Sequence, residues 1–184
     1  LRAFYKERGK PRKDLTVRAE FDDGTVTALK PFDAAVAAYA GYMSIATEPL
    51  INAFIGVNVH PADLSVMDGD SRKYTGDHAV RDAILAGENF LRATTHLIEL
   101  QVDYGRILMI SPPLAVNLPA DFDPSNKNQV KAVAEEHQNR LKEAGDWVIF
   151  PRTLEDLATG RYSQDEQGTL YFDQRPIPQG LRLE

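Results

Sequence analysis

Residues 33–60, DAAVAAYAGYMSIATEPLINAFIGVNVH, contain the pattern that decides the fold. The first part, Asp33–Tyr39, is almost continuously apolar, which is typical of a fully buried strand in a parallel sheet. Thr47–Phe54 has a proline in its first turn and predicts a short helix, and Ile55–His60 predicts a second strand. A strand, a helix and a strand in succession indicate an α/β domain.

The flanking sequence extends this pattern. Four further helices are expected, at Asp14–Leu29, Asp77–Ala86, Gln129–Ala144 and Trp147–Ala158. In the last of these, the helical spacing of Trp147 with Phe150 and Leu154 predicts a core position for the tryptophan. Residues 61–76 are polar and rich in turn formers, and therefore predict a long loop, a kind of segment that often has a function.

Two later apolar runs predict a β-hairpin. Arg92–Leu100 and Arg106–Val116 face each other across a turn at Asp103–Gly105. We therefore expect a mostly parallel sheet with a C-terminal antiparallel hairpin, in a single domain spanning 1–184. Within it, residues 1–13 are expected to form a basic connector and residues 161–184 a tail with short strands.

The composition limits the classes of function. The 184 residues include 21 basic and 27 acidic side chains, and the net charge of −6 argues against a general nucleic-acid binder. There is no cysteine, so disulfides, thiolate catalysis and cysteine-ligated zinc or iron–sulfur sites are excluded. The longest apolar run is far shorter than a membrane span. We therefore expect a cytoplasmic domain that binds neither nucleic acid nor membrane.

Asn58 and His60 are the first candidates for chemistry. Side chains alternate faces along a strand, so these two point the same way at the carboxyl end of a predicted strand, where open α/β sheets bind ligands. An amide N–H can donate to a developing oxyanion, and an imidazole transfers protons near neutral pH. The same pair also fits a plain strand end and loop cap. Asp103 lies in the hairpin turn, where aspartate is common for backbone hydrogen bonding alone.

The other histidines are weaker candidates for a site. His96 is expected to be a hydrogen-bonded structural residue, and His78 to lie in the first turn of a helix. His137 lies in a run of polar and charged residues, which predicts a solvated helix face. No H-x-x-x-H or H-E-x-x-H spacing occurs, so we expect no metal site.

Five motifs occur in order along the chain: Ala40-Gly-Tyr-Met-Ser-Ile45, Gly56-Val-Asn-Val-His-Pro61, Gly76-Asp-His-Ala with Ala83-Ile-Leu-Ala-Gly87, Thr94-Thr-His96 with Val102-Asp-Tyr-Gly-Arg-Ile-Leu108, and Ala158-Thr-Gly-Arg-Tyr162 with Tyr171–Pro178. Together they resemble the folate-dependent formyltransferases, over about four-fifths of the chain from Phe32 to Pro178. One such motif is a weak signal, whereas five in the right order and spacing are a strong one.

The resemblance implies a fold and a set of site residues. The fold is a Rossmann-like formyltransferase domain, here without the family's N-terminal βα portion and its glycine-rich phosphate loop. Asn58 would donate to the formyl oxygen, His60 would act as an imidazolium, and Asp103 would pair with His60 and raise its pKa. The folate would lie between Tyr42, Met43, Ser44, Ile45 on one wall and Leu100, Gln101, Val102 on the other. Asp146, at the place of a family glutamate, would bind the acceptor.

The chain also departs from the family pattern. Ser44 stands where the family has an arginine, and Arg106 where it has a proline. An expanded loop after the His-Pro pair contains Arg72 and Lys73. These two are expected to be exposed loop charges, with contact to an acceptor phosphate or to the glutamate tail of the folate as the alternative.

The resemblance implies transfer of a formyl group from 10-formyltetrahydrofolate to a small amine, without a metal. Glycinamide ribonucleotide, in purine biosynthesis, is the first acceptor to consider, and an amino sugar nucleotide is another. A formyltetrahydrofolate hydrolase would use the same three residues with water in place of the amine. A folate-binding protein without turnover is the alternative that is not an enzyme. Assembly into a homodimer is left open.

Overall fold

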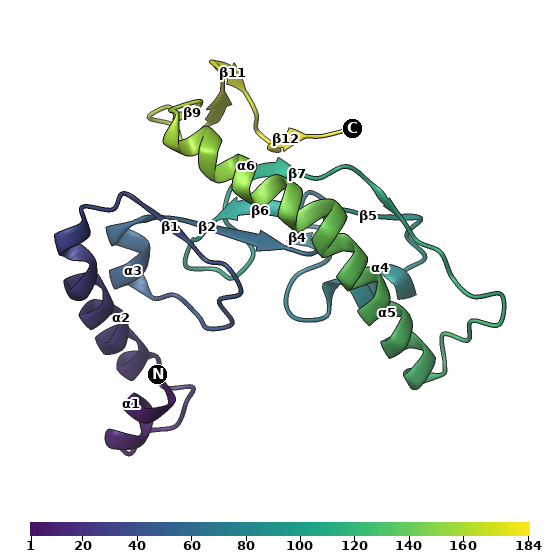
Figure 1. Cartoon of the computed structure of the whole chain (residues 1–184), viewed down its shortest axis with the longest axis horizontal. Coiled ribbons are helices and arrows are strands. Elements are labelled where there is room, and N and C mark those ends of the chain that lie inside the picture. Colours follow the sequence, from purple (N-terminus) through teal and green to yellow (C-terminus); the bar gives the residue numbers. More distant parts are fainter.

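The computed structural model describes all residues, 1–184 (Figure 1). Its centre is a five-stranded sheet in the order β1-β2-β6-β7-β12, with β1 at Val36–Ala38, β2 at Ile55–His60, β6 at Thr94–Leu97, β7 at Ile107–Ile110 and β12 at Leu181–Arg182. The pairs β1–β2 and β7–β12 are parallel, and β6 is antiparallel to both of its neighbours. Only β6 therefore runs against the other strands. The predicted mostly parallel α/β sheet with an antiparallel hairpin is confirmed.

The first predicted strand differs from the expectation of full burial. Strand β1 has three residues and forms the edge of the sheet, with β2 as its one neighbour. Val36 and Ala37 are half-buried and Ala38 is exposed. An apolar run predicts a strand but does not show whether a second strand covers its other side, so burial could not be derived from the run alone.

The N-terminal helices pack together beside β1. Helix α1 (Arg2–Glu7) lies within the segment expected to be a connector, and the Tyr5 hydroxyl donates to the Asp14 carbonyl at 3.2 Å. Phe4 packs edge-on against Phe21 of α2 (Leu15–Leu29). These aromatic contacts explain why a basic, glycine-containing segment is ordered against the next helix. Asp14 caps α2 as predicted, since its carboxylate accepts from the N–H groups of Thr16 and Val17.

Several short elements follow, of which the sequence predicts the two helices but not the 3-10 turn or the two small pairs of strands. The chain passes through the 3-10 turn η1 (Lys30–Phe32), and α3 (Glu48–Ala53) then connects β1 to β2. The loop after β2 contains a small ribbon of β3 (Met67–Asp68) and β4 (Ser71–Arg72). Helix α4 spans Ala79–Leu85, and β5 (Phe90–Leu91) pairs with β8 (Leu114–Ala115).

The two predicted C-terminal helices form one rod that crosses the sheet (Figure 1). Helix α5 (Lys127–Leu141) runs through the π-helical turn η2 (Lys142–Asp146) into α6 (Trp147–Ala158), and α6 contacts β2, β6 and β7. A Cβ on Gly145 would lie 2.9 Å from the Cβ of Ala93, so glycine allows this turn to approach the sheet closely.

Two expectations for this rod are wrong. Trp147 is 68% exposed, while Phe150 and Leu154 are partly buried against the sheet. Helical spacing places the three side chains along one side of α6, but it does not show how far the sheet extends along the helix, and Trp147 lies at the N-terminal end of α6. His137 is fully buried rather than solvated: its Nδ1–H donates to the Val133 carbonyl, and its Nε2 accepts from the Asn117 N–H.

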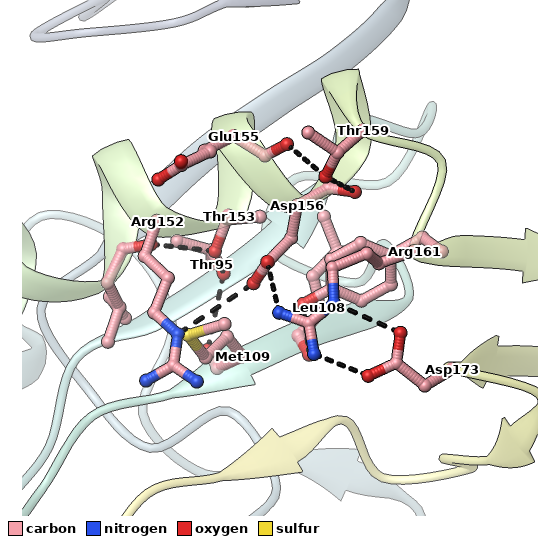
Figure 2. A network of polar contacts seen from close by, with 12 residues as sticks. Thr95, Leu108, Met109, Arg152, Thr153, Glu155, Asp156, Thr159, Arg161 and Asp173 are labelled. Carbon is pink, nitrogen blue, oxygen red and sulfur yellow. Dashed lines mark hydrogen bonds and ion pairs between the residues drawn. The ribbon is translucent and has the colours of Figure 1, made fainter.

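An ion-pair network joins α6 to the tail (Figure 2). The Asp156 carboxylate contacts Nη1 of Arg161 at 2.8 Å and Nε of Arg152 at 3.8 Å. Arg161 also pairs with Asp173 and lies 4.3 Å from the ring centroid of Phe172. The tail itself consists of β9 (Tyr162–Gln164), β10 (Leu170–Phe172), β11 (Arg175–Pro176) and then β12.

The main core lies between α4, the α5–α6 rod and the sheet. It includes Val80, Ile84, Met109, Leu141 and Ile149, each nearly inaccessible. This packing fixes β2 and the β6–β7 hairpin, from which the candidate site residues project. None of the helices has the length and apolar composition that a membrane crossing requires.

Candidate active site

Asn58 and His60 lie in the C-terminal half of strand β2. Both line the same cavity, as the alternation of side chains along a strand predicts. Asn58 is half-buried and His60 is 5% exposed. The cavity has a volume of about 400 Å³. Two polar groups therefore face a pocket large enough for part of a drug-sized ligand.

Asp103 reaches the same cavity from the turn of the β6–β7 hairpin. Its φ is +59°, in the left-handed region that few residues other than glycine adopt. Its carboxylate is 7% exposed, and Oδ2 accepts from the Gly76 N–H at 2.7 Å. A Cβ on Gly105 would lie 1.7 Å from the Leu97 carbonyl oxygen, so only glycine lets this turn close onto β6.

His60 and Asp103 form a polarised pair. Nδ1 of His60 is 3.5 Å from Oδ2 of Asp103, and Nε2 is 2.9 Å from the Tyr74 carbonyl oxygen. A carbonyl only accepts, so Nε2 carries a hydrogen. The nitrogen that gains or loses a proton is therefore Nδ1, which faces the carboxylate.

His96 is a second histidine on the same carboxylate. Its Nδ1–H donates to the Leu97 carbonyl at 2.8 Å, and its Nε2 lies 3.7 Å from Oδ1 of Asp103 and 3.4 Å from Nδ2 of Asn58. It is 2% exposed. His96 is hydrogen-bonded as expected, but it also lines the cavity, so it belongs to the site as well as to the framework.

Burial lowers the pKa of His60 below its ordinary value, and this effect is larger than the opposing effect of Asp103. Asp103 thus acts to raise the pKa of His60 as expected, but the net shift is downward because burial has the larger effect. Burial also lowers the pKa of His96. Both imidazoles are thus favoured in the neutral form near pH 7.

The predicted folate walls mostly surround this cavity. The lining residues among them are Tyr42, Met43, Ser44, Ile45, Leu100 and Val102. Gln101 is not part of the lining. Met43 and Leu100 are among the most exposed apolar side chains of the protein. Exposed apolar groups on the two sides of a polar cavity are typical of a ligand site.

Helix α2 holds one of these walls. Oδ2 of Asp22 accepts from both the N–H and the hydroxyl of Thr47, at 3.0 and 2.7 Å. Arg18 pairs with Asp22 at 2.8 Å, and its guanidinium lies 5.3 Å from the ring centroid of Tyr42. This buried ion pair therefore fixes the two ends of the 42–47 segment.

Asp146 does not line the cavity. It lies in the π-helical turn η2, and its Oδ1 is buried without a hydrogen-bond partner. Burial raises the pKa of Asp146 to about 6. A buried carboxylate oxygen without a partner is costly, and π-helical turns occur often at functional sites. No nearby residue offers it a compensating hydrogen bond.

Several cavity residues could not be predicted from sequence patterns: Tyr39, Asp77, Ile98, Glu99 and Gln138. They come from the segment just after β1, the segment before α4, the hairpin and α5. His96 pairs directly with Asn58 in the β2–β6 ladder, so only knowledge of that strand register would have placed it in the site. Opposed residues in a non-local pair are close in space but separated in sequence.

The chain is similar to known proteins in sequence and in fold. The family model described as "Formyl transferase" matches residues 5–144. The phosphoribosylglycinamide formyltransferase of Haemophilus influenzae is 27% identical over 169 residues, covering 91% of this chain and 69% of that protein. The trifunctional purine biosynthetic protein adenosine-3 of Drosophila melanogaster is 29% identical over 150 residues, covering 80% of this chain.

The chain spans about a tenth of the Drosophila protein. Among solved structures, the phosphoribosylglycinamide formyltransferase of Coxiella burnetii superposes with a TM-score of 0.64 at 19% identity, covering 91% of this chain and 70% of that one. This similarity shows the Rossmann-like formyltransferase fold.

Proposed function

Because this chain belongs to the formyl transferase family, we propose that it transfers a formyl group from 10-formyltetrahydrofolate to a small amine. Glycinamide ribonucleotide is the proposed acceptor, since the relatives include a phosphoribosylglycinamide formyltransferase. The observation that carries the proposal is the convergence of Asn58, His60 and Asp103 on one cavity. An amide donor, an imidazole and a carboxylate are the groups that acyl transfer to an amine needs.

In the proposed reaction, the amine attacks the formyl carbon and the carbonyl oxygen becomes an oxyanion. The Asn58 amide N–H donates to that oxygen, which is worth roughly 10²–10³ in rate for one such donor. His60 begins neutral and takes up a proton at Nδ1 as the amine loses one. The resulting imidazolium lies 3.5 Å from Asp103, which stabilises it. His60 then donates this proton to the folate nitrogen as the bond between that nitrogen and the formyl carbon breaks.

The apolar walls of the cavity are proposed to hold the folate ring. Tyr42, Met43, Ser44 and Ile45 provide one side, and Leu100 and Val102 the other. Stacking a flat heterocycle between such side chains removes apolar area from water, at about 25 cal/mol per Å². The backbone of Gln101 connects two lining residues, so its proposed contact with the ring is through the main chain.

Asp146 is proposed to bind the acceptor. The support for this is its buried oxygen, which has no partner within the protein, and its position on the same helical rod as Gln138, which lines the cavity. An N–H or O–H group of the acceptor would supply the missing hydrogen bond to the carboxylate.

The test is a turnover assay of the purified full-length protein with a 10-formylfolate, following the deformylated folate by absorbance. Release that requires glycinamide ribonucleotide would support the transferase and its acceptor. Release at the same rate without any amine would show that the protein is a hydrolase and not a transferase. Release only with another amine, such as an amino sugar nucleotide, would correct the acceptor. Binding of the folate without release would refute the enzymatic proposal, and Asn58→Ala is the control for chemistry at this site.

A further inference from the structure

Arg72, on the β3–β4 ribbon, contacts the turn that carries Asp103. We propose that Arg72 is a positioning residue, which holds the Asp103 turn and adds a fixed positive charge to the turn whose carboxylate both histidines contact. Its effect on catalysis rests on the proposed function, whereas its effect on the histidines does not. The loop that contains it is one of the places where this sequence departs from the family pattern.

The contacts of Arg72 are with backbone and ring atoms of the hairpin turn. Its Nη1 donates to the Asp103 carbonyl at 2.6 Å. Its own N–H donates to the Tyr104 hydroxyl at 3.2 Å, and its guanidinium lies 5.6 Å from the Tyr104 ring centroid. Both the side chain and the backbone of Arg72 thus hold two successive residues of the turn.

The turn needs such a restraint. Asp103 has a left-handed φ of +59°, a conformation that a residue with a Cβ keeps only when its surroundings impose it. Arg72 holds the Asp103 carbonyl, and Gly76, four residues later, holds its carboxylate at 2.7 Å. One loop therefore fixes both the main chain and the side chain of Asp103, and with them the 3.5 Å contact to His60.

Arg72 also acts through its charge. It is half-buried and does not line the cavity, so its positive charge is only partly screened by water. The charged groups that face His60 are Asp103, Arg72 and Asp77, and those that face His96 are Asp103, His60 and Arg72. Arg72 lowers the pKa of both histidines, against the effect of the carboxylates. It thus favours the neutral imidazoles from which the proposed reaction begins.

The experiment compares Arg72→Gln with Arg81→Gln in the full-length protein. Arg81 is a half-buried arginine on α4 whose ion pair is with its neighbour Asp82 and not with the turn, so the control removes the same charge without removing a contact to Asp103. The two readouts are steady-state turnover and the NMR titration of the imidazole carbon–hydrogen signals in the substrate-free protein. The second readout does not require any activity.

We expect Arg72→Gln to lower kcat by about 10- to 100-fold with KM for the folate changed less than about 2-fold, because it removes a charged hydrogen bond that orients a reacting group. The pKa of His60 and His96 should rise. Arg81→Gln should change neither quantity. Arg72→Lys keeps the charge, so it should keep the histidine titrations near those of the unmodified protein while recovering only part of kcat.

Unchanged kcat and unchanged histidine titrations in a folded Arg72→Gln protein would overturn the proposal. So would equal losses of kcat in the Gln and Lys variants without any movement of the titrations, because that result describes a purely structural brace. If Arg72→Gln does not fold, Arg72→Lys tests the proposal instead. It should leave the titrations of the two histidines nearly unchanged while kcat falls below that of the unmodified protein. If the unmodified protein shows no turnover but the titrations move as expected, the proposed function fails and the electrostatic role of Arg72 stands.

Discussion

Two buried aspartates show how similar groups can have different uses. Asp103 is 7% exposed and Asp156 is 4% exposed. Asp156 lies between two arginines, with Arg161 at 2.8 Å (Figure 2). Asp103 instead has a backbone N–H and two histidines around its carboxylate, at 3.5 and 3.7 Å.

The partners determine what each carboxylate can do. A guanidinium stays charged at any pH a protein tolerates, so the Asp156 network is a permanent ion pair. An imidazole gains and loses a proton near neutral pH, so the Asp103 cluster can exchange protons. Arg161 also ties Asp156 to Asp173 and Phe172, which connects α6 to the tail. One region fixes the structure, and the other is arranged for chemistry.

The largest effect should follow from breaking the Asp103 cluster. Asp103→Asn, His60→Ala and Asn58→Ala should each lower kcat by about 10²–10⁴-fold, because each removes a proton-transfer or oxyanion group. The fold should remain, as judged by circular dichroism. Turnover within about threefold of the unmodified protein, in any one of the three, would remove that residue from the proposed site.

Asp156→Ala should instead reduce stability and leave turnover nearly unchanged. It should lower the free energy of unfolding by about 2 kcal/mol, less than for a fully buried pair, because both arginines are partly exposed. The melting temperature should fall by roughly 4–8 °C for a chain of this size. Turnover at a temperature where the variant is folded should stay within about twofold. A stable variant that has lost turnover would show instead that this network serves the site.

The parts of the fold that depend on local pattern could be predicted from the sequence. The second strand has the predicted bounds, Ile55–His60, and the last helix has the predicted bounds, Trp147–Ala158. Both follow from hydrophobic periodicity and helix-end signals within a dozen residues. The β1 strand was predicted, but its place at the sheet edge was not, because that depends on which strands pair.

The candidate site also has features that follow from local sequence patterns and features that depend on tertiary packing. That Asn58 and His60 share a face follows from strand geometry alone. That His96 lies opposite Asn58 depends on the register between β2 and β6, which no local pattern contains. The net direction of the His60 pKa shift depends on how deeply the ring is buried, which is a property of the packed protein. The same holds for His137, whose polar sequence neighbours suggested exposure.

Asp146→Asn should stabilise the protein. The pKa of Asp146 is raised to about 6 in the folded state, so its charged form is disfavoured there, and the cost develops as the pH rises from about 4 to 6. Above pH 7 the amide should raise the free energy of unfolding by about 1–2 kcal/mol, a value reduced for the partial exposure of the side chain. At pH 4 the variant and the unmodified protein should have the same free energy of unfolding.

Urea unfolding at the two pH values measures this effect, with Glu143→Gln, an exposed neighbour, as the control. The same Asp146→Asn variant should raise KM for the acceptor if the carboxylate binds it. Stabilisation with an unchanged KM would leave Asp146 as an unfavourable buried charge without a role in binding. Destabilisation at neutral pH would contradict the burial argument itself.

The smallest effect concerns the pH dependence of turnover. Because burial lowers the pKa of His60, the neutral form needed at the start of the proposed reaction should persist below pH 6.5, and kcat should change less than about twofold between pH 6.5 and 7.5. The activity should fall only on further acidification, and replacing the exposed His78 by Asn should not move this limb. If His60 had to be an imidazolium from the start, kcat would instead decrease as the pH rises through its pKa. The slope of kcat against pH therefore decides whether the Asp103 cluster begins by accepting a proton or by donating one.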